Sequence, residues 1–226
     1  MQDSIIEGLD WPHQARLAVC VIVAGFNSAN DANAVGMDSL QHRLLDFLRE
    51  RAVPAGLVGD FGTQLQQGRE ASSFQMLSRY AGEPSNNDIV AAGESTSGAG
   101  SQQWELALGH AAEPRWIEDN GRNRLLIPLD RQCSDSQMLQ PPWWTPDEWL
   151  QYAMDSFDCL HQEAEHRPRV FGLHLTPLAS GRSGTIQALG QLLGYIHERE
   201  SVWLAGVSDI AQHCLQLQAT AKGTKA

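Results

Sequence analysis

Lysine and paired cysteines are scarce in this chain of 226 residues. Its lysines are Lys222 and Lys225. The chain has 16 lysine and arginine residues and 27 aspartate and glutamate residues, so the formal net charge is −11. Nucleic-acid binding needs a basic surface that displaces counterions from phosphates, so this balance disfavours a nucleic-acid partner. The four cysteines are widely scattered without a CxxC pair, which disfavours a zinc ribbon or a dithiol redox motif.

Signals for membrane insertion and secretion are absent as well. No apolar run approaches the roughly 20 residues that span a bilayer. The first residues carry Asp3, Glu7 and Asp10 and lack the basic and apolar regions of a secretory leader. With 42% hydrophobic and 19% charged residues, the composition is typical of a folded globular protein. We expect a cytoplasmic protein with no membrane partner, one domain over residues 1–221 and a polar tail over residues 222–226.

What is present is an alternation of short apolar runs with amphipathic segments. Arg16 to Gly25 is a β-branched run ended by glycine, which predicts a buried strand. Met37 to Ala52 has apolar residues at helical spacing, and Ala55 to Gly59 is a second short apolar run after Pro54. This strand, helix and strand form the unit that builds a parallel sheet.

The second half of the chain repeats this order after a well-marked helix start. Thr145 is a good N-cap residue and Pro146 suits the first helical position, so a helix is predicted from there to about His166. The elements predicted after it are the strand Arg169 to Leu175, the helix Thr185 to Glu198, the strand Ser201 to Ala205 and the helix Val207 to Leu217. Helices and strands alternate here too.

The middle of the chain gives weaker signals. Arg115 to Glu118 and Arg124 to Leu129 flank an Asp-Asn-Gly sequence, which favours a tight hairpin turn. Thr63 to Tyr80 is predicted to be helical, and Gly82 to Ser101 to be a loop around one weak strand, Asp88 to Ala92. The whole pattern predicts an α/β fold, either a closed barrel or an open doubly wound sheet.

Short motifs in the last third follow one order: a helix, a strand with Leu-His, a Gly-Arg loop, a second helix and a strand with Trp. Their residues are Phe157-Asp158-Cys159-Leu160, Glu163, Pro168-Arg169, Gly172-Leu173-His174, Gly181-Arg182, Ala188-Leu189, Tyr195-Ile196, Val202-Trp203 and Asp209-Ile210-Ala211-Gln212-His213. This part of the chain resembles the allantoinase-like branch of the NodB-homology (polysaccharide deacetylase-like) family. Weaker likenesses cover residues 44–59 and 124–135. The resemblance implies a distorted (β/α) barrel of the polysaccharide deacetylase type, complete or incomplete.

The family's metal site has no counterpart in this sequence. Polysaccharide deacetylases of this type have paired aspartates after the first strand and a His-x-x-x-His pair after the second. Here Gly25-Phe26-Asn27-Ser28 follows the first strand, and no two histidines stand four residues apart. Residues 82–109 also look shorter than the matching stretch of the allantoinase-like relatives. Those relatives are regarded as working without the metal, so we predict no metal and no other cofactor.

His174 is the first candidate catalytic residue. It ends a predicted strand, where barrel side chains reach the catalytic face, and the resemblance implies a role as an acid or a ligand. An imidazole that titrates near neutrality suits protonation of a leaving amine, whereas the alternative is a core histidine bonded to backbone. Asp60 and Asp135 each follow a predicted strand and are candidates for the carboxylate that activates water. Either aspartate can equally be a turn residue or a helix cap.

Three further residues are candidates for substrate binding. Arg182 has a planar fork that could hold a carboxylate or a ureido group, or could form a loop-fixing salt bridge instead. Trp144 could form an aromatic wall for a substrate or only pack against the helix that follows it. Asp31 follows the first predicted strand and could reach the same barrel mouth.

Two functions stay open at this point. The leading hypothesis is a hydrolase that acts on a non-peptide carbon–nitrogen bond of a small amide, ureide or N-acetyl substrate. The alternative is a non-catalytic family member that serves as a binding or assembly module, because the metal and aspartate motifs are missing. The first hypothesis requires a small-molecule substrate as partner. A homo-oligomer is compatible with both, since Trp143 and Trp144 could lie at an interface.

Overall fold

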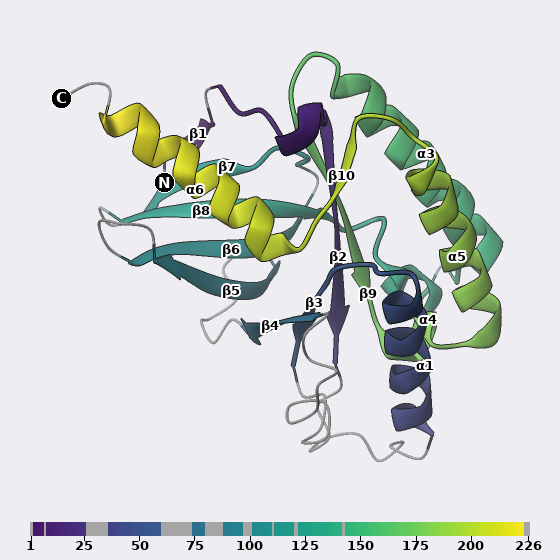
Figure 1. Ribbon diagram of the computed structural model, residues 1–226. Helices are drawn as coiled ribbons and strands as arrows, with labels where there is room; N and C mark the ends of the chain where they lie inside the picture. The colour runs from purple at the N-terminus through teal and green to yellow at the C-terminus, as the bar shows by residue number, and fades with distance from the viewer. Residues whose placement is uncertain are drawn as a thin grey trace.

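A computed structural model describes residues 2–6, 8–25, 36–59, 74–79, 88–96, 101–109, 111–119, 122–141 and 143–223 (Figure 1). Its strands are β1 (Gln2–Ile5), β2 (Leu17–Ala24), β3 (Ala55–Val58), β4 (Phe74–Arg79), β5 (Asp88–Thr96), β6 (Ser101–Gly109), β7 (Arg115–Asp119), β8 (Arg122–Asp130), β9 (Arg169–Leu175) and β10 (Val202–Leu204). Its helices are α1 (Met37–Glu50), α3 (Pro146–Glu163), α4 (Pro177–Ser180), α5 (Ser183–His197) and α6 (Val207–Gly223), with the short 3-10 helices η1 (Pro12–Gln14) and η3 (Asp135–Met138). Among these residues, no helix is both long and apolar enough to cross a membrane.

Strand β2 is the centre of a parallel group of strands. One of its edges pairs with β9 along the register Leu17 to Val23. The other edge pairs with β10 beside Leu17 to Val19 and with β3 beside Val21 to Ala24. Strand β4 pairs in parallel with β3 and adds one more strand to this group. Because both faces of β2 are covered, its sequence is a continuous apolar run rather than an alternating one.

The remaining strands continue the sheet with mixed directions. β5 is antiparallel to β4 and to β6, and β6 is parallel to β8. The hairpin predicted from the Asp-Asn-Gly sequence is confirmed, because β7 and β8 pair antiparallel with Arg115 opposite Leu126. β1 adds to β7 as an antiparallel edge strand that the sequence analysis did not predict.

Strands β8 and β9 approach each other within this curved sheet without forming a ladder. β9 passes β8 at Gly172, where an added Cβ would lie 3.2 Å from Leu129 Cα, so only glycine fits there without displacement. Just upstream, the backbone N–H of Val170 donates to Ala112 O at 2.8 Å. Within the described ranges no ladder joins β8 to β9. The arrangement is an incomplete, distorted (β/α) barrel, which is the fold that the resemblance implied.

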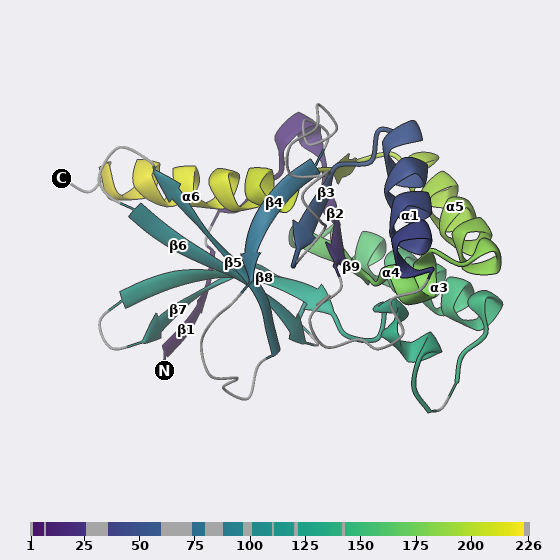
Figure 2. The same ribbon diagram turned by 90° about the horizontal axis from the view of Figure 1, so that it is seen from below.

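Two apolar layers pack on the two faces of β2. Leu17, Val19, Val21 and Val23 belong to an outer cluster with residues of α1, α3 and α5. The alternate residues, of which Ile22 is the largest, belong to an inner cluster with α6 and with strands β6 and β8. Figure 1 and Figure 2 show the three outer helices on one side of β2 and β9, while α6 runs along β5, β6 and β8.

The helix predicted from Thr145 onward is confirmed with its capping box. The Thr145 Oγ1 accepts the Glu148 N–H at 3.2 Å, and the Glu148 Oε2 accepts the Thr145 N–H at 2.7 Å. These bonds satisfy N–H groups that have no partner within the helix. The other helices and strands predicted in the two halves of the chain are also present, with α6 continuing beyond the predicted end at Leu217.

The middle of the chain differs from its prediction. The predicted helix Thr63 to Tyr80 is wrong over Phe74–Arg79, which forms β4, while its other residues lie outside the described ranges. The predicted strand Asp88 to Ala92 is confirmed within β5. The predicted loop is wrong over residues 93–96, where β5 continues and pairs with β6, a strand that was not predicted, while residues 82–87 and 97–100 lie outside the described ranges. Pairing with two neighbouring strands overrides a weak local helix preference, since strand formation depends on cross-strand packing.

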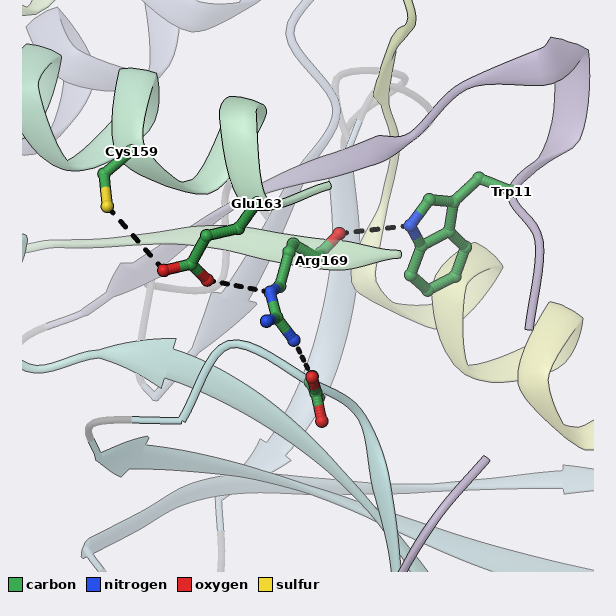
Figure 3. A network of polar contacts seen from close by, with 5 residues as sticks. Trp11, Cys159, Glu163 and Arg169 are labelled. Carbon is green, nitrogen blue, oxygen red and sulfur yellow. Dashed lines mark hydrogen bonds and ion pairs between the residues drawn. The ribbon is translucent and has the colours of Figure 1, made fainter. Parts of the chain in front are cut away.

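Figure 3 shows how Arg169, the first residue of β9, is held by several parts of the chain. Its Nε donates to Glu163 Oε2 at the end of α3 at 3.0 Å, and its Nη1 pairs with Glu113 in the segment before β7. Its backbone carbonyl accepts the Trp11 Nε1–H at 3.1 Å. These contacts fix the amino end of β9 and thereby the position of the residues at its other end.

Candidate functional site

His174 lies near the carboxyl end of β9, opposite Ile22 of β2. Side chains alternate along a strand, so His174 shares a face with Val170, which belongs to the inner cluster. Only 9% of the residue is exposed. His174 therefore stands near the end of a strand as predicted, and its reaching the catalytic face stays a prediction.

Ser134 is the hydrogen-bonding partner of His174. The Ser134 Oγ lies 3.2 Å from His174 Nδ1, and Ser134 is itself 1% exposed. Burial lowers the pKa of His174 to about 4, so the ring is neutral at neutral pH instead of titrating there as expected. Among the described residues, none forms a hydrogen bond to its Nε2. Sequence reasoning missed Ser134, although the residue stands in the segment 124–135 that resembles the family.

Asp135 follows Ser134 and is completely buried. Its Oδ2 accepts the Thr176 N–H and the Ser180 hydroxyl, both at 2.6 Å, and its Oδ1 accepts the Thr176 hydroxyl at 3.0 Å. Burial raises the pKa of Asp135 to about 7, although the hydrogen bonds from Ser180 and Thr176 oppose that rise. The carboxylate therefore ties η3 to the segment that follows His174.

These contacts build one largely buried polar group, which we call the β9 cluster: Ser134, Asp135, His174, the half-buried Thr176, and Ser180. Two adjacent residues of the segment before α3 contact two residues at the end of β9, so the parts hold each other in place. In the described part of the chain, no group of three or more His, Cys, Asp or Glu side chains is placed to hold a metal ion. The absence of a cofactor stays a prediction.

Arg182 and Trp144, both predicted to bind substrate, line the same pocket of about 240 Å³. Met138 and Ala179 line it too, and these residues belong to η3 and α4, the two elements that Asp135 connects. Arg182 is exposed at the start of α5. The Trp144 ring packs on Tyr152 with 5.1 Å between centroids, so packing and pocket-lining roles coexist.

Three other residues are candidates for the site or for an interface. Asp31 and Asp60 lie outside the described residues, so their predicted roles stay predictions. Trp143 is 66% exposed, and its role at an interface stays a prediction. The structure thus places His174 and Asp135 in one cluster, in which Ser134 contacts His174 and Asp135 contacts Thr176, and it places Arg182 and Trp144 in one pocket.

Comparisons with known proteins agree with this fold. No family model matches the chain. Over 104 residues it is 31% identical to a Schizosaccharomyces pombe (strain 972) protein named "Putative polysaccharide deacetylase", a match that covers 45% of this chain and 32% of that protein. The chain therefore spans about a third of the length of that relative.

Two solved structures show the same architecture. Puue allantoinase superposes with a TM-score of 0.65 at 18% identity, covering 90% of this chain and 91% of that one. A Mycobacterium smegmatis protein named "putative polysaccharide deacetylase" superposes with a TM-score of 0.68 at 15% identity, covering 93% of this chain and 94% of that one. At these identities the likeness concerns the fold. The chain has the NodB-type fold of polysaccharide deacetylase-like and allantoinase proteins, and the resemblance stated from its sequence is confirmed.

Proposed function

We propose that this protein is a hydrolase that cleaves a non-peptide carbon–nitrogen bond in a small amide, ureide or N-acetyl substrate. The observation that carries this proposal is the neutral, buried His174, which Ser134 holds at the inner side of a barrel of the deacetylase type. The names of the similar proteins, a deacetylase and an allantoinase, support the same class of bond.

In the proposed reaction His174 acts first as a base. The neutral imidazole takes a proton from a water molecule, the water oxygen bonds to the substrate carbonyl carbon, and the carbon–nitrogen bond breaks. The departing nitrogen then receives the proton from His174. Asp60 is the proposed carboxylate that orients this water. Asp135 is a positioning residue, because its two oxygens already accept three hydrogen bonds from Thr176 and Ser180.

The Arg182 pocket, whose lining includes Ala179 next to Ser180 of the β9 cluster, suits the substrate side of this proposal. Its volume of about 240 Å³ fits a small group rather than a long chain segment. Arg182 supplies planar donors for a carboxylate or ureido oxygen, and Trp144 supplies an apolar wall. We propose that the acyl or ureido end of the substrate enters here.

The non-catalytic module remains the rival, and one observation favours it. Among the described residues, no carboxylate contacts His174, and the nearby Asp135 is fully occupied by the scaffold. A histidine in such a cluster can serve packing alone. The rival and the proposal differ in what happens when His174 loses its basic nitrogen.

The test is a hydrolysis assay on an N-acetyl sugar, a small aliphatic amide and a ureide. We expect His174→Gln to lower kcat/KM at least about 100-fold, the usual contribution of a general base. His166→Gln, at an exposed position, is the matched control and should keep wild-type activity. Full activity in His174→Gln would refute the mechanism, and a folded wild type inert toward all three substrates would favour the rival.

The pH profile separates a base from an acid. With a pKa of about 4, a base at His174 keeps kcat/KM constant from neutral pH down to that value. An obligatory imidazolium would instead make the rate rise tenfold per pH unit toward about pH 4.

A further inference from the structure

A second cavity lies on the other side of the sheet from the β9 cluster. It has a volume of about 450 Å³ and forms where the end of α1, the second half of α5 and strand β10 meet. β10 pairs with Leu17 to Val19 of β2, whereas His174 pairs with Ile22. The two sites are therefore near opposite ends of β2, roughly 10 to 16 Å apart along the strand at 3.3 Å per residue.

The body of this cavity is apolar. Leu193 and Ile196 of α5, Val53 after α1 and Leu204 of β10 contribute to its lining. Gly194 lines it as well, and an added Cβ at Gly194 would have no atom within 4 Å. The size falls in the range of small-molecule sites, about 300 to 1,000 Å³.

The charged residues of the lining are arginines. Arg51 and Arg199 line the cavity together with His197, and none of the acidic residues in the described ranges does, although the chain has 27 acidic residues and a net charge of −11. A local excess of positive charge in such an acidic protein favours an anion, because elsewhere the surface repels one.

Both arginines lie over aromatic rings, and Arg199 also forms an ion pair with Asp158. The Arg51 guanidinium lies 3.8 Å from the centre of the Phe47 ring, with one weak bond to Phe47 O at 3.4 Å. The Arg199 guanidinium lies 4.2 Å from the centre of the Tyr195 ring, and its ion pair with Asp158 is long at 3.8 Å. Stacking on a ring face fixes the guanidinium plane and leaves N–H groups at its edge for an anion.

We propose that this cavity binds a small amphipathic organic anion, with its apolar body against α5 and β10 and its carboxylate at Arg51 and Arg199. The apolar lining accounts for the body of such a ligand, and the basic side chains account for its charge. This site is independent of the proposed hydrolysis, because none of its lining residues belongs to the β9 cluster or to the Arg182 pocket.

Fluorescence titration with anilinonaphthalene sulfonate tests the site, with decanoate as competitor. We expect saturable binding at one site that decanoate displaces, and weak binding of the uncharged N-phenylnaphthylamine. Gly194→Leu places a side chain in the open space of the cavity and should abolish binding of the sulfonate dye. The helix gains a better helix former, so this variant should fold normally. Arg51→Gln combined with Arg199→Gln should weaken the anion about tenfold and leave the neutral dye unchanged.

Gln191→Leu is the matched control, because it adds the same side chain at an exposed position of α5 outside the cavity. It should bind the dye as the wild type does, and thermal unfolding should show that every variant is folded. Dye binding that survives in folded Gly194→Leu would overturn the site. Equal affinity for the charged and neutral dyes would overturn the anionic class of ligand.

Discussion

At the scale of single residues, two side chains of the β9 cluster titrate in opposite directions. Burial lowers the pKa of His174 from 6.5 to about 4 and raises that of Asp135 from 3.8 to about 7. Between these limits His174 loses a proton on folding, so its contribution makes stability rise with pH. Asp135 gains a proton on folding, so its contribution makes stability fall with pH. Because the two windows overlap, the contributions largely cancel in the wild type.

Replacing either residue should reveal the pH dependence of stability that the other one contributes. In His174→Gln, the free energy of unfolding should fall as pH rises from about 4 to about 7, by on the order of 3 kcal/mol. In Asp135→Asn, it should instead rise between about pH 4 and 6.5. Urea unfolding at a series of pH values measures both slopes.

Asp155→Asn is the control for these slopes, since Asp155 is exposed on α3. It should show the pH dependence of the wild type. If all three variants share one slope, then the β9 cluster is not the source of the titration.

The sequence and its resemblance predicted His174 and Asp135 as site residues, and the structure places them in one cluster. The contact that joins Ser134 to His174 spans 40 residues of chain, so no local pattern marks it. The same reason hides the role of Asp135: its donors, Thr176 and Ser180, are 41 and 45 residues away.

At the scale of elements, the start of α3 makes a direct prediction. Thr145→Ala removes the oxygen that accepts the Glu148 N–H, so the protein should lose about 1 kcal/mol of stability. Thr145→Ser keeps a hydroxyl and should stay close to the wild type. Chemical denaturation measures both variants, and an unchanged stability in Thr145→Ala would show that the capping box contributes nothing.

The difference between α3 and β4 shows which elements a sequence can reveal. The start of α3 depends on residues three positions apart, so its signal is local and its prediction was right. β4 forms because its residues pair with those of β3, with Phe74 opposite Ala55, and no local pattern in its sequence predicts a strand. β6 did carry a signal, since buried Trp104 and Leu106 alternate with Glu105, whose carboxylate pairs with Arg124 on the other face.

At the scale of the whole molecule, Gly172 marks where β9 packs closely against β8 although no ladder joins the two strands. Gly172→Ala would press a methyl group against the backbone of Leu129, so we expect a loss of about 1–3 kcal/mol in the free energy of unfolding. Gly194→Ala, at an open helical position, is the control and should be neutral or slightly stabilising. Denaturant unfolding compares the two. Equal stabilities would mean that β8 and β9 do not pack closely in solution.

The local residue patterns by themselves determined the long helices α1, α3, α5 and α6 and the strands β2, β3, β9 and β10, and the resemblance to a known family indicated the fold. These features depend on residue types within a few positions of each other, such as the apolar run of β2 and the cap of α3. Only the tertiary structure decided that the barrel stays open beside Gly172, that β4 is a strand, and that burial keeps His174 neutral. Each of these results depends on which distant segments come together in space. A pKa and the pairing of a strand are set by residues that are close in the fold and distant in the chain.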